Sequence, residues 1–535
     1  MIKKAELVFV PAPGVGHLVS TLEFAKRLID RDDRILITVL VMKLPFSSFV
    51  FVNAYFKSSI TASQSGSAIR LIDLPEVEPH PPEILNESVE CYFTLFIESL
   101  VVDFFCVSMV DVASELCLPC YIFFPSNAGF LSLMLYLPTT CHDQMINTVF
   151  ESSDSELIIP GFVNPVPVSV LPPALFNKYG YSSFIKLAQR FNDANGIIVN
   201  TFSKLEPHAV DSFSSILKPS VYTVGPVLEL KGQPNPDLDK DHCHKILKWL
   251  DDQSESSVVF LCFESGGSFG PAQVKEIATG LEQSEYKFVW SLRVSQPSNK
   301  SPLVLDSNST NGDDDVFTKG FMERVKGRGM ICAWAPQVEV LAHKAIGGFV
   351  SHCGWNSILE SLWYSVLIVT WPLYAEQQLN AFRMVKELGL AVEMRLDSTT
   401  DGGDLVMADE IGRAIRCVMD GDSDIRKKVK QMAETSNKAL LHGRSSFSYL
   451  WFGMPIATWP LNAEQKLNAF RMLKELGLAM EIGLDSRREG GDLVMADERA
   501  RAVRCVRDGD GEMRKKVKEY VVRSPHYNTC TMYSS

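Results

Sequence analysis

Short apolar runs alternate with amphipathic stretches along the first third of the chain. The runs in AELVFVP and ILITVLVM have the length of buried strands, and LEFAKRLIDR between them has apolar positions at helical spacing. Further strand-like runs are LVVDFFCVS, CYIFFPS and GIIVNTF. This alternation predicts an α/β fold in which helices cover a parallel sheet.

A second alternating series begins near SSVVFLCFES and continues through KFVWSLR, GMICAWAP, GGFVSHCG and SVLIVTWP. The two series meet in SVYTVGPVLEL, around residue 225, so we expect two α/β domains in tandem at residues 1–225 and 226–449. The polar segment SQPSNKSPLVLDSNSTNGDDD is typical of a surface loop.

The end of the chain repeats part of the second domain. Residues 362–431 and 450–519 align without gaps at an offset of 88, with 48 of the 70 positions identical. The second copy starts midway through the predicted domain, so it lacks preceding strands and cannot build a complete core alone. We therefore interpret residues 450–535 as a partial duplicate with a tail, appended to the two domains as a passenger. The alternative is that this copy competes for the place of the first, which would require a longer loop.

Composition narrows the possible partners and compartment. The 535 residues carry a net charge of −12 and show no basic stripe, which argues against a nucleic-acid partner. No apolar run is long enough to span a membrane, and MIKKAELVFV is too quickly polar for a signal peptide. Twelve scattered cysteines fit reduced thiols, so we expect a cytoplasmic protein.

The first strand leads into a glycine-containing turn, VPAPGVGHLVSTLEFAKRL. No Lys-Ser or Lys-Thr follows, which excludes a P-loop, and a dinucleotide fingerprint is broken because Val19 stands where the third glycine belongs. What remains is a tight turn that sets His17 at the mouth of a strand, the edge where open α/β sheets bind ligands. His17 either packs against the start of the helix or acts on a ligand there.

A second candidate site lies in WAPQVEVLAHKAIGGFVSHCGWNSILESLWYSVLIVTWPLYAEQ. AIGGFVSH predicts a strand ending in His352, CGWNS a turn and NSILESLWY a helix. A helix N-terminus after a strand offers N–H groups to an anion; His352, Asn356 and Ser357 add donors, and Gly354 allows close backbone approach. This combination favours a diphosphate site without a metal-binding motif.

The same segment offers groups for the rest of a nucleotide sugar. Trp334 has a flat face for a base, and Glu360 and Glu376 have carboxylates for sugar hydroxyls. Each residue also has a purely structural interpretation: Ser357 and Glu360 form a capping-box pattern, and His352 and Trp334 could be core residues. Their convergence at one strand–helix junction favours a nucleotide-sugar site.

This 44-residue segment resembles the signature box of plant family 1 UDP-dependent glycosyltransferases. The length from Trp to Gln matches that box, as do W-A-P-Q, H-C-G-W-N-S, the E-S pair and A-E-Q. The resemblance extends from residue 1 to about 449 and includes PAPGVGH, VVDFFC, VYTVGP, GSFGPAQVKEIA and KALLHGRSSFSYL. It is greatest to the branch that glycosylates flavonoids, terpenoids and related small hydroxylated molecules.

The resemblance implies a GT-B fold, with two Rossmann-like domains facing across a cleft and the acceptor held by the N-terminal domain. His17 matches the catalytic base of the family, and Asp103 matches the aspartate that pairs with it. An ordinary histidine titrates near pH ~6.5 and can take a proton from an acceptor hydroxyl, while an aspartate stabilises the imidazolium. The deprotonated acceptor oxygen would attack the anomeric carbon on the face opposite the departing UDP. The configuration at that carbon would then be inverted.

The resemblance also implies roles at the UDP-sugar site. Trp334 would stack on uracil, Gln337 and Glu360 would hold the nucleoside, and Glu376 and Gln377 would hold the sugar. Gln377 favours glucose over galactose, and Trp355 would position the sugar through its backbone. UDP-glucose is then a co-substrate, and neither a cofactor nor a metal is expected. The complete expected donor site is Ser265, Trp334, Ala335, Gln337, His352, Gly354, Trp355, Asn356, Ser357, Glu360, Glu376 and Gln377.

The chain departs from the family pattern at several places. Glu264 stands where the family has Gly, and its carboxylate would repel a diphosphate. Ser365 and Leu367 replace the Gly and Pro of W-x-G-V-P, which would loosen the donor side. FTLFIESL runs directly into VVDFFC, where the family has a longer helix and loop, and this shortening affects the surroundings of Asp103.

The leading interpretation is a monomeric UDP-glucose-dependent O-glucosyltransferase that acts on a small lipophilic hydroxylated acceptor, such as a flavonoid, another phenolic or a terpenoid. The alternative is a degenerate, non-catalytic relative that only binds small molecules, which Glu264, the shortened segment and the repeat favour. A nicotinamide-dependent dehydrogenase is the third interpretation. The missing third glycine of the dinucleotide fingerprint argues against it.

Overall fold

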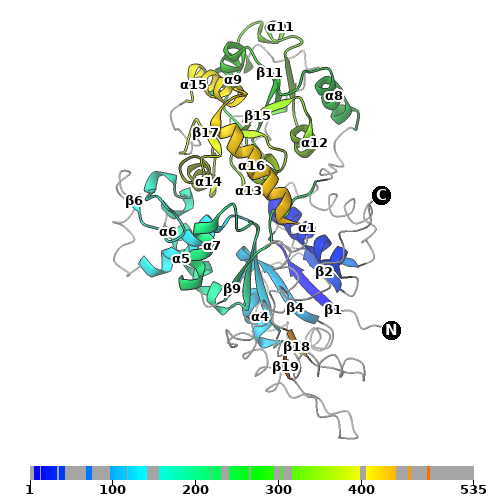
Figure 1. Cartoon of the computed structure of the whole chain (residues 1–535), viewed down its shortest axis with the longest axis vertical. Helices are drawn as coiled ribbons and strands as arrows, with labels where there is room; N and C mark the ends of the chain where they lie inside the picture. Colours follow the sequence, from blue (N-terminus) through cyan, green and yellow to red (C-terminus); the bar gives the residue numbers. More distant parts are fainter. Residues whose placement is uncertain are drawn as a thin grey trace, which may run out of the picture.

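The computed structural model shows two α/β domains stacked along the long axis of the molecule (Figure 1). It describes residues 5–12, 14–32, 35–41, 68–74, 97–116, 118–140, 156–176, 178–216, 219–230, 240–263, 267–294, 303–304, 316–397, 405–441, 456–458 and 479–481.

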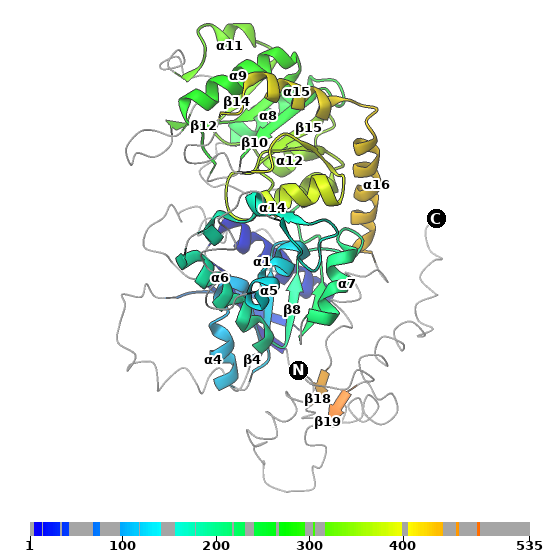
Figure 2. The ribbon, with the colours of Figure 1, turned by 90° about the vertical axis from the view of Figure 1, so that its left-hand side faces the viewer.

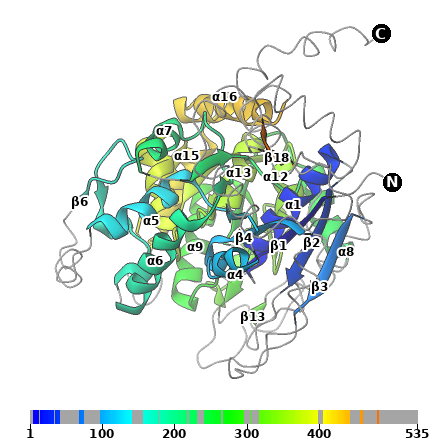
Figure 3. The same ribbon diagram turned by 90° about the horizontal axis from the view of Figure 1, so that it is seen from below.

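The N-terminal domain is built on a parallel seven-stranded sheet. Its strands are almost wholly apolar because helices bury both faces of the sheet. Figure 3 shows β3, β2, β1 and β4 side by side from the edge inward. In spatial order the strands are β3 (Ile69–Asp73), β2 (Ile35–Val41), β1 (Ala5–Val10), β4 (Ile97–Asp103), β5 (Cys120–Phe124), β8 (Gly196–Val199) and β9 (Ser220–Thr223).

Helix α1 (Val15–Arg31) covers one face of this sheet through Leu18, Leu22 and Ala25, which recur at helical spacing and are buried. The opposite face carries α4 (Met109–Glu115), α5 (Ala128–Thr140), α6 (Lys178–Arg190) and α7 (Pro207–Ile216). Short elements complete this domain: η3 (Phe104–Cys106), η4 (Val168–Val170), η5 (Pro173–Phe176), η6 (Phe191–Asp193), and the antiparallel pair β6 (Glu156–Leu157) and β7 (Val166–Pro167).

The C-terminal domain has a parallel six-stranded sheet whose strands follow the 3-2-1-4-5-6 order of a Rossmann fold. In spatial order they are β14 (Gly329–Cys332), β11 (Lys287–Ser291), β10 (Val258–Cys262), β15 (Ile346–Ser351), β16 (Leu367–Thr370) and β17 (Ala391–Glu393). Its helices are α8 (Lys240–Asp251), α9 (Pro271–Ser284), α11 (Phe321–Arg324), α12 (Gln337–Ala342), α13 (Trp355–Trp363), α14 (Gln377–Phe382) with the π-helical η7 (Arg383–Glu387), α15 (Ala408–Met419) and α16 (Asp424–Ala439).

Two helices of the C-terminal domain lie where the domains meet. Helix α14 lies directly above the N-terminal domain, and α16 runs down the side of the molecule (Figure 2). Leu379 and Phe382 of α14 are buried in the core of the N-terminal domain. The two domains therefore share apolar contacts at the base of α14.

Each sheet reverses its strand order at one point, and both reversals open toward the region between the domains. In the N-terminal sheet the reversal lies between β1 and β4, and in the C-terminal sheet between β10 and β15. Ligands of open α/β sheets bind at such points, beyond the carboxyl ends of the strands. The fold thus places the residues that follow β1, β4 and β15 at a common cleft.

The structure shifts two of the predicted strand ends. LVVDFFCVS reads as one strand, but β4 ends at Asp103 and Phe104–Cys106 form a 3₁₀ turn. The turn forms because the Asp103 carboxylate accepts a hydrogen bond from the Phe105 N–H at 2.9 Å. Strand β15 likewise ends at Ser351, one residue before His352.

Two segments that stood out in the sequence are described only in part. Within the predicted surface loop at 295–315, Leu303–Val304 (β13) pair antiparallel with Arg293–Val294 (β12). Within the repeat, β18 (Ile456–Thr458) and β19 (Ala479–Glu481) pair parallel. Ile456 faces Ala479 just as Ile368 faces Ala391 in the first copy, each shifted by the repeat offset, but β18 and β19 form a separate sheet. The predicted inability of this copy to complete a core concerns residues that lie mostly outside the described ones.

Across the residues that the structure describes, no helix combines the length and apolarity that crossing a membrane requires.

Candidate active site

His17 and Asp103 meet at the carboxyl edge of the N-terminal sheet. His17 lies in the first turn of α1, directly after β1, and Asp103 is the last residue of the neighbouring β4. His17 Nδ1 is 2.6 Å from Asp103 Oδ2. An ionised carboxylate only accepts hydrogen bonds, so Nδ1 carries the proton and Nε2 is the basic nitrogen.

Burial distinguishes the two members of this pair. The Asp103 side chain is fully buried, whereas 26% of the His17 side chain is exposed. Asp103 also accepts from the Phe105 N–H, so both of its oxygens are held in place. A fixed carboxylate behind a partly exposed imidazole is the arrangement that orients a general base.

Two aromatic rings lie together beside the imidazole. The centroids of Phe104 and Phe105 lie 5.6 Å and 5.3 Å from that of His17. Phe104 is buried, but half of Phe105 is exposed. Phe130 and Phe184 extend this apolar wall, and the four rings line one cavity. These rings were not predicted from the sequence as part of the site, although Phe104 and Phe105 directly follow Asp103 in the chain.

The cavity has a volume of about 410 Å³ and takes its lining from both domains. All the predicted site residues that the structure describes line it, except Asp103, which lies behind His17. Ser265 and the departure at Glu264 fall outside the described residues. Further lining residues not foreseen from the sequence include Ser126, Ser291, Arg293 and Tyr374.

The turn between β15 and α13 forms the centre of the C-terminal wall. Gly354 precedes the first turn of α13 in an extended conformation, and a Cβ there would lie 2.4 Å from His352 Nε2. Only glycine fits under the His352 ring. The first N–H groups of α13 have no acceptor within the helix, so this turn can bind an anion. Because Gly354 is the N-cap, the capping-box interpretation of Ser357 and Glu360 is wrong.

Gln337 links the residues predicted to hold the nucleoside. Its Nε2 donates to Ser357 Oγ at 2.9 Å and to Glu360 Oε2 at 2.7 Å. Glu360 is buried, and burial raises its pKa to about 7, with smaller contributions from the charges of Glu339 and Glu229. Trp334 is half-buried and Ala335 buried at the same end of the cavity.

The residues predicted to hold the sugar begin α14. Gln377 Oε1 accepts from the N–H groups of Leu373 and Tyr374 at 3.0 Å and 3.1 Å. These contacts fix the amide so that its Nε2 is the end available as a donor. Glu376 Oε1 accepts from Ser126 Oγ of the N-terminal domain at 3.0 Å. The sugar end of the site therefore contacts both domains.

Trp355 and Asn356 also cross between the domains. Trp355 Nε1 donates to the Asn200 carbonyl at 2.6 Å. Asn356 Nδ2 donates to the Gly16 carbonyl at 3.3 Å, and Asn356 Oδ1 accepts from Ser20 Oγ at 3.1 Å. The start of α13 is thus tied to the start of α1, the helix that carries the imidazole.

Ser365, which stands where the family has glycine, has an unusual backbone conformation. Ser365 has φ +61°, in the left-handed region that favours glycine. Leu367, at the position of the missing proline, is fully buried and starts β16, which pairs in register with β15 and β17. The strand is kept, and the strain is confined to the turn before it.

Among the described residues, no group of three or more His, Cys, Asp or Glu side chains could hold a metal ion.

Comparisons with known proteins agree on one family. The sequence pattern described as UDP-glucoronosyl and UDP-glucosyl transferase matches residues 167–423. UDP-glycosyltransferase 71K1 of Malus domestica is 51% identical over 477 residues, which cover 84% of this chain and 97% of the relative. A flavonol 3-O-glucosyltransferase, UGT71C4 of Arabidopsis thaliana, is 48% identical over 477 residues, covering 83% and 96%.

A solved structure of the same kind superposes on both domains. Medicago truncatula UGT71G1, in a complex with UDP-glucose, matches with a TM-score of 0.73 and 49% identity, covering 84% of this chain and 97% of that one. The likeness supports the GT-B fold expected from the sequence.

Proposed function

The chain belongs to the UDP-glycosyltransferases, and on that premise we propose that it transfers glucose from UDP-glucose to a hydroxyl of a small lipophilic acceptor, with inversion at the anomeric carbon. The observation that carries this proposal is the 2.6 Å contact between His17 and Asp103 at a cavity whose opposite wall is the predicted UDP-sugar site. A base on one domain and a donor site on the other fit transfer across the cleft.

In the proposed reaction His17 Nε2 takes the proton of the acceptor hydroxyl. The oxygen attacks the anomeric carbon of the sugar, and the bond from that carbon to the diphosphate breaks. The electron pair leaves with UDP, and Asp103 stabilises the imidazolium that forms. Attack from the face opposite the leaving group converts an α-linked donor into a β-glycoside.

The C-terminal wall would hold UDP-glucose along its length. Trp334 would stack on uracil, with Ala335 beside it, and Gln337 and Glu360 would hold the nucleoside. The turn at His352 and Gly354, with Ser357, Asn356 and Ser265, would stabilise the charge on the departing diphosphate. Glu376 and Gln377 would hold the sugar hydroxyls, with Trp355 positioning the sugar through its backbone.

Glucose as the donor sugar is supported by two relatives. UGT71C4 is named as a flavonol 3-O-glucosyltransferase, and UGT71G1 was crystallised with UDP-glucose. The acceptor end is lined by Phe104, Phe105, Phe130 and Phe184, which present apolar rings beside the base. Flat phenolic acceptors such as flavonols suit that wall, because aromatic rings stack on one another.

The organisation of the whole chain follows from the same proposal. Residues 1–225 would bind the acceptor and residues 226–449 the donor, and residues 450–535 would be a partial duplicate that transfer does not need. A monomer suffices, because one chain supplies both walls of the cavity. Cys106, Cys120 and Cys417 are thiols, which supports a cytoplasmic location.

The test begins with titration calorimetry of UDP into the purified full-length chain. Binding in the micromolar range is expected if the donor site forms despite Glu264. Transfer is then measured with UDP-glucose and UDP-galactose against a panel of flavonols, simple phenols and terpenoid alcohols, and the product's anomeric configuration is read by NMR. UDP binding without transfer to any acceptor would favour the degenerate, binding-only relative, and an α-glycoside would overturn the proposed mechanism.

A further inference from the structure

Helix α14, its N-cap and its π-helical continuation carry four polar residues that face the N-terminal domain. Glu376, Asn380, Arg383 and Glu387 are spaced four, three and four residues apart, which places them on one face of the helix. We call them the α14 stripe. Each of the four contacts a residue of the N-terminal domain.

Arg383 is the most deeply buried charge of the stripe. Its Nε lies 2.8 Å from Glu206 Oε1, and the side chains of this ion pair are 3% and 0% exposed. Arg383 Nη1 donates to the Gly161 carbonyl at 3.2 Å, and the guanidinium carbon lies 4.8 Å from the Phe162 ring centroid. A Cβ on Gly129 would lie 2.6 Å from Nη1. The slot in the N-terminal domain therefore fits a guanidinium closely.

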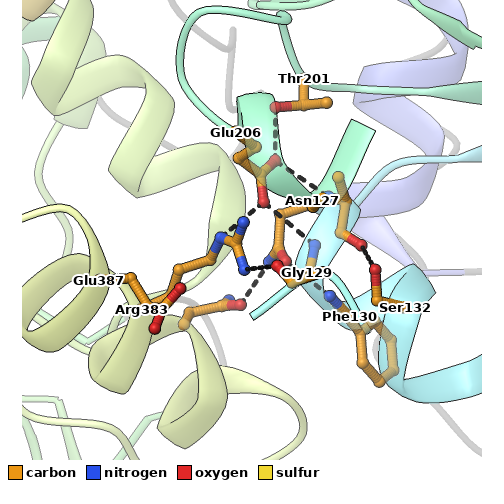
Figure 4. A network of polar contacts seen from close by, with 12 residues as sticks. Asn127, Gly129, Phe130, Ser132, Thr201, Glu206, Arg383 and Glu387 are labelled. Atoms are coloured by element: carbon orange, nitrogen blue, oxygen red, sulfur yellow. Dashed lines mark hydrogen bonds and ion pairs between the residues drawn. The ribbon is translucent and has the colours of Figure 1, made fainter. Parts of the chain in front are cut away.

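Glu206 holds more than Arg383. Its two oxygens accept from the N–H groups of Ala128 and Gly129 at 2.9 Å and 3.1 Å, and from Thr201 Oγ1 at 2.5 Å. These contacts cap the N-terminus of α5. Figure 4 shows Arg383 extending from the π-helical continuation of α14 toward Glu206, with the start of α5 on the other side of Glu206.

The α14 stripe also contacts the two parts of the donor site that are proposed to hold the diphosphate and the sugar. Asn380 accepts from Asn127 Nδ2 at 2.5 Å and donates to the Cys353 carbonyl at 3.0 Å, inside the turn proposed to bind the diphosphate. Glu376, proposed to hold the sugar, accepts from Ser126 Oγ. One helix face thus connects the sugar end and the diphosphate turn to a single segment of the N-terminal domain, residues 126–129.

That segment is part of the same sheet edge as the catalytic pair. It follows β5, and β5 pairs with β4 so that Phe123 lies opposite Asp103. We propose that Arg383 is a positioning residue for transfer: through Glu206 it fixes the distance between the sugar held by the C-terminal domain and the base held by the N-terminal domain. The inference rests on the proposed transfer reaction.

Replacing Arg383 should affect UDP binding and glucose transfer differently. The groups proposed to hold UDP lie on the C-terminal domain, so replacing Arg383 should leave UDP affinity within about twofold. A misplacement of about 1 Å between sugar and base can lower the rate by about a hundredfold. Water needs no such alignment with the N-terminal domain, so a loosened interface should raise the share of UDP-glucose lost to hydrolysis.

The experiment compares Arg383→Met and Arg383→Lys with the control Arg395→Met in the full-length chain. Arg395 pairs with Glu410 at 3.1 Å inside the C-terminal domain, so its loss removes an ion pair without touching the interface. We expect Arg383→Met to lower kcat for transfer at least tenfold, to raise the ratio of hydrolysis to transfer, and to keep UDP binding. Arg383→Lys, which keeps the charge, should recover part of the loss, and Arg395→Met should behave like the wild type.

Small-angle scattering adds a readout that does not depend on catalysis. Arg383→Met should increase the radius of gyration relative to Arg395→Met, because removing one partner leaves Glu206 as a buried, uncompensated charge at the interface. Equal losses of transfer and hydrolysis, or unchanged scattering with unchanged kcat, would overturn the inference. Absence of transfer in the wild type would instead count against the proposed function, and scattering would still decide the role of Arg383.

Discussion

The ionisation of Glu360 should make UDP binding depend on pH. Burial raises the pKa of Glu360 to about 7, so about nine-tenths of the free protein carries a neutral carboxyl at pH 6 and about one-tenth at pH 8. A carboxylate accepts through both oxygens, whereas a neutral carboxyl uses one of them to donate. If Glu360 accepts from the nucleoside hydroxyls, the ionised form is the one that binds.

The size of the effect follows from the fraction that is competent to bind. An apparent Kd is the intrinsic Kd divided by that fraction, so raising the pH from 6 to 8 should tighten UDP binding about tenfold. At pH 7 binding should release about half a proton, because half of the free Glu360 is protonated there. The sign is fixed by the raised pKa: affinity is lost as the pH falls through 7.

Titration calorimetry at pH 6, 7 and 8, in buffers of different ionisation enthalpy, measures both quantities. Glu360→Gln is the matched control, since it keeps the size of the side chain and an oxygen to accept from Gln337. The phosphate of UDP itself titrates near pH ~6, and burial also raises the pKa of Glu23 to about 7. The UDP phosphate and Glu23 titrate in the variant as well, so the pH dependence of UDP binding that remains in Glu360→Gln is their contribution. The same pH slope in Glu360→Gln as in the wild type would refute the reasoning.

Three further predictions address the rest of the chain. Ser365→Gly should raise the unfolding free energy by about 0.5–1 kcal/mol in denaturant titrations by relieving the positive φ, whereas Ser365→Ala should not. Asp103→Asn should lower kcat about 10³–10⁴-fold in a transfer assay while UDP affinity in calorimetry stays within twofold, because the amide cannot hold the imidazolium. Removing residues 450–535 should leave kcat and KM within twofold, and loss of activity would show that the repeat takes part in the folded enzyme.

Much of the fold could be predicted because its strands are uniformly apolar and its helices amphipathic. The two series of alternating elements became two parallel sheets, and the strand-to-turn positions of His17 and His352 both lie at the cleft. The contact between His17 and Asp103 could not be derived from spacing alone. It depends on β1 and β4 being neighbours in the sheet, which the resemblance to a known family supplied.

The contacts between domains could not be predicted from the sequence. Trp355 and Asn356 have the side chains expected of a ligand site, yet both bond across to the N-terminal domain. Arg383 looks like one charge among several on an amphipathic helix, and its partner lies in the other domain. Local periodicity shows which face of a helix is apolar, but it carries no information about the domain that packs against a polar face. The capping-box interpretation failed because Gly354, and not Ser357, is the N-cap of α13.

The central claim is that His17 is the base for glucose transfer at an intact donor site. It is tested most directly by assaying His17→Ala and the wild type side by side for transfer from UDP-glucose to an accepted phenol, with UDP binding measured on the same samples. The account predicts that the variant binds UDP as the wild type does and transfers about 10²–10⁴-fold more slowly. Transfer at the wild-type rate by His17→Ala, with UDP binding unchanged, would contradict it.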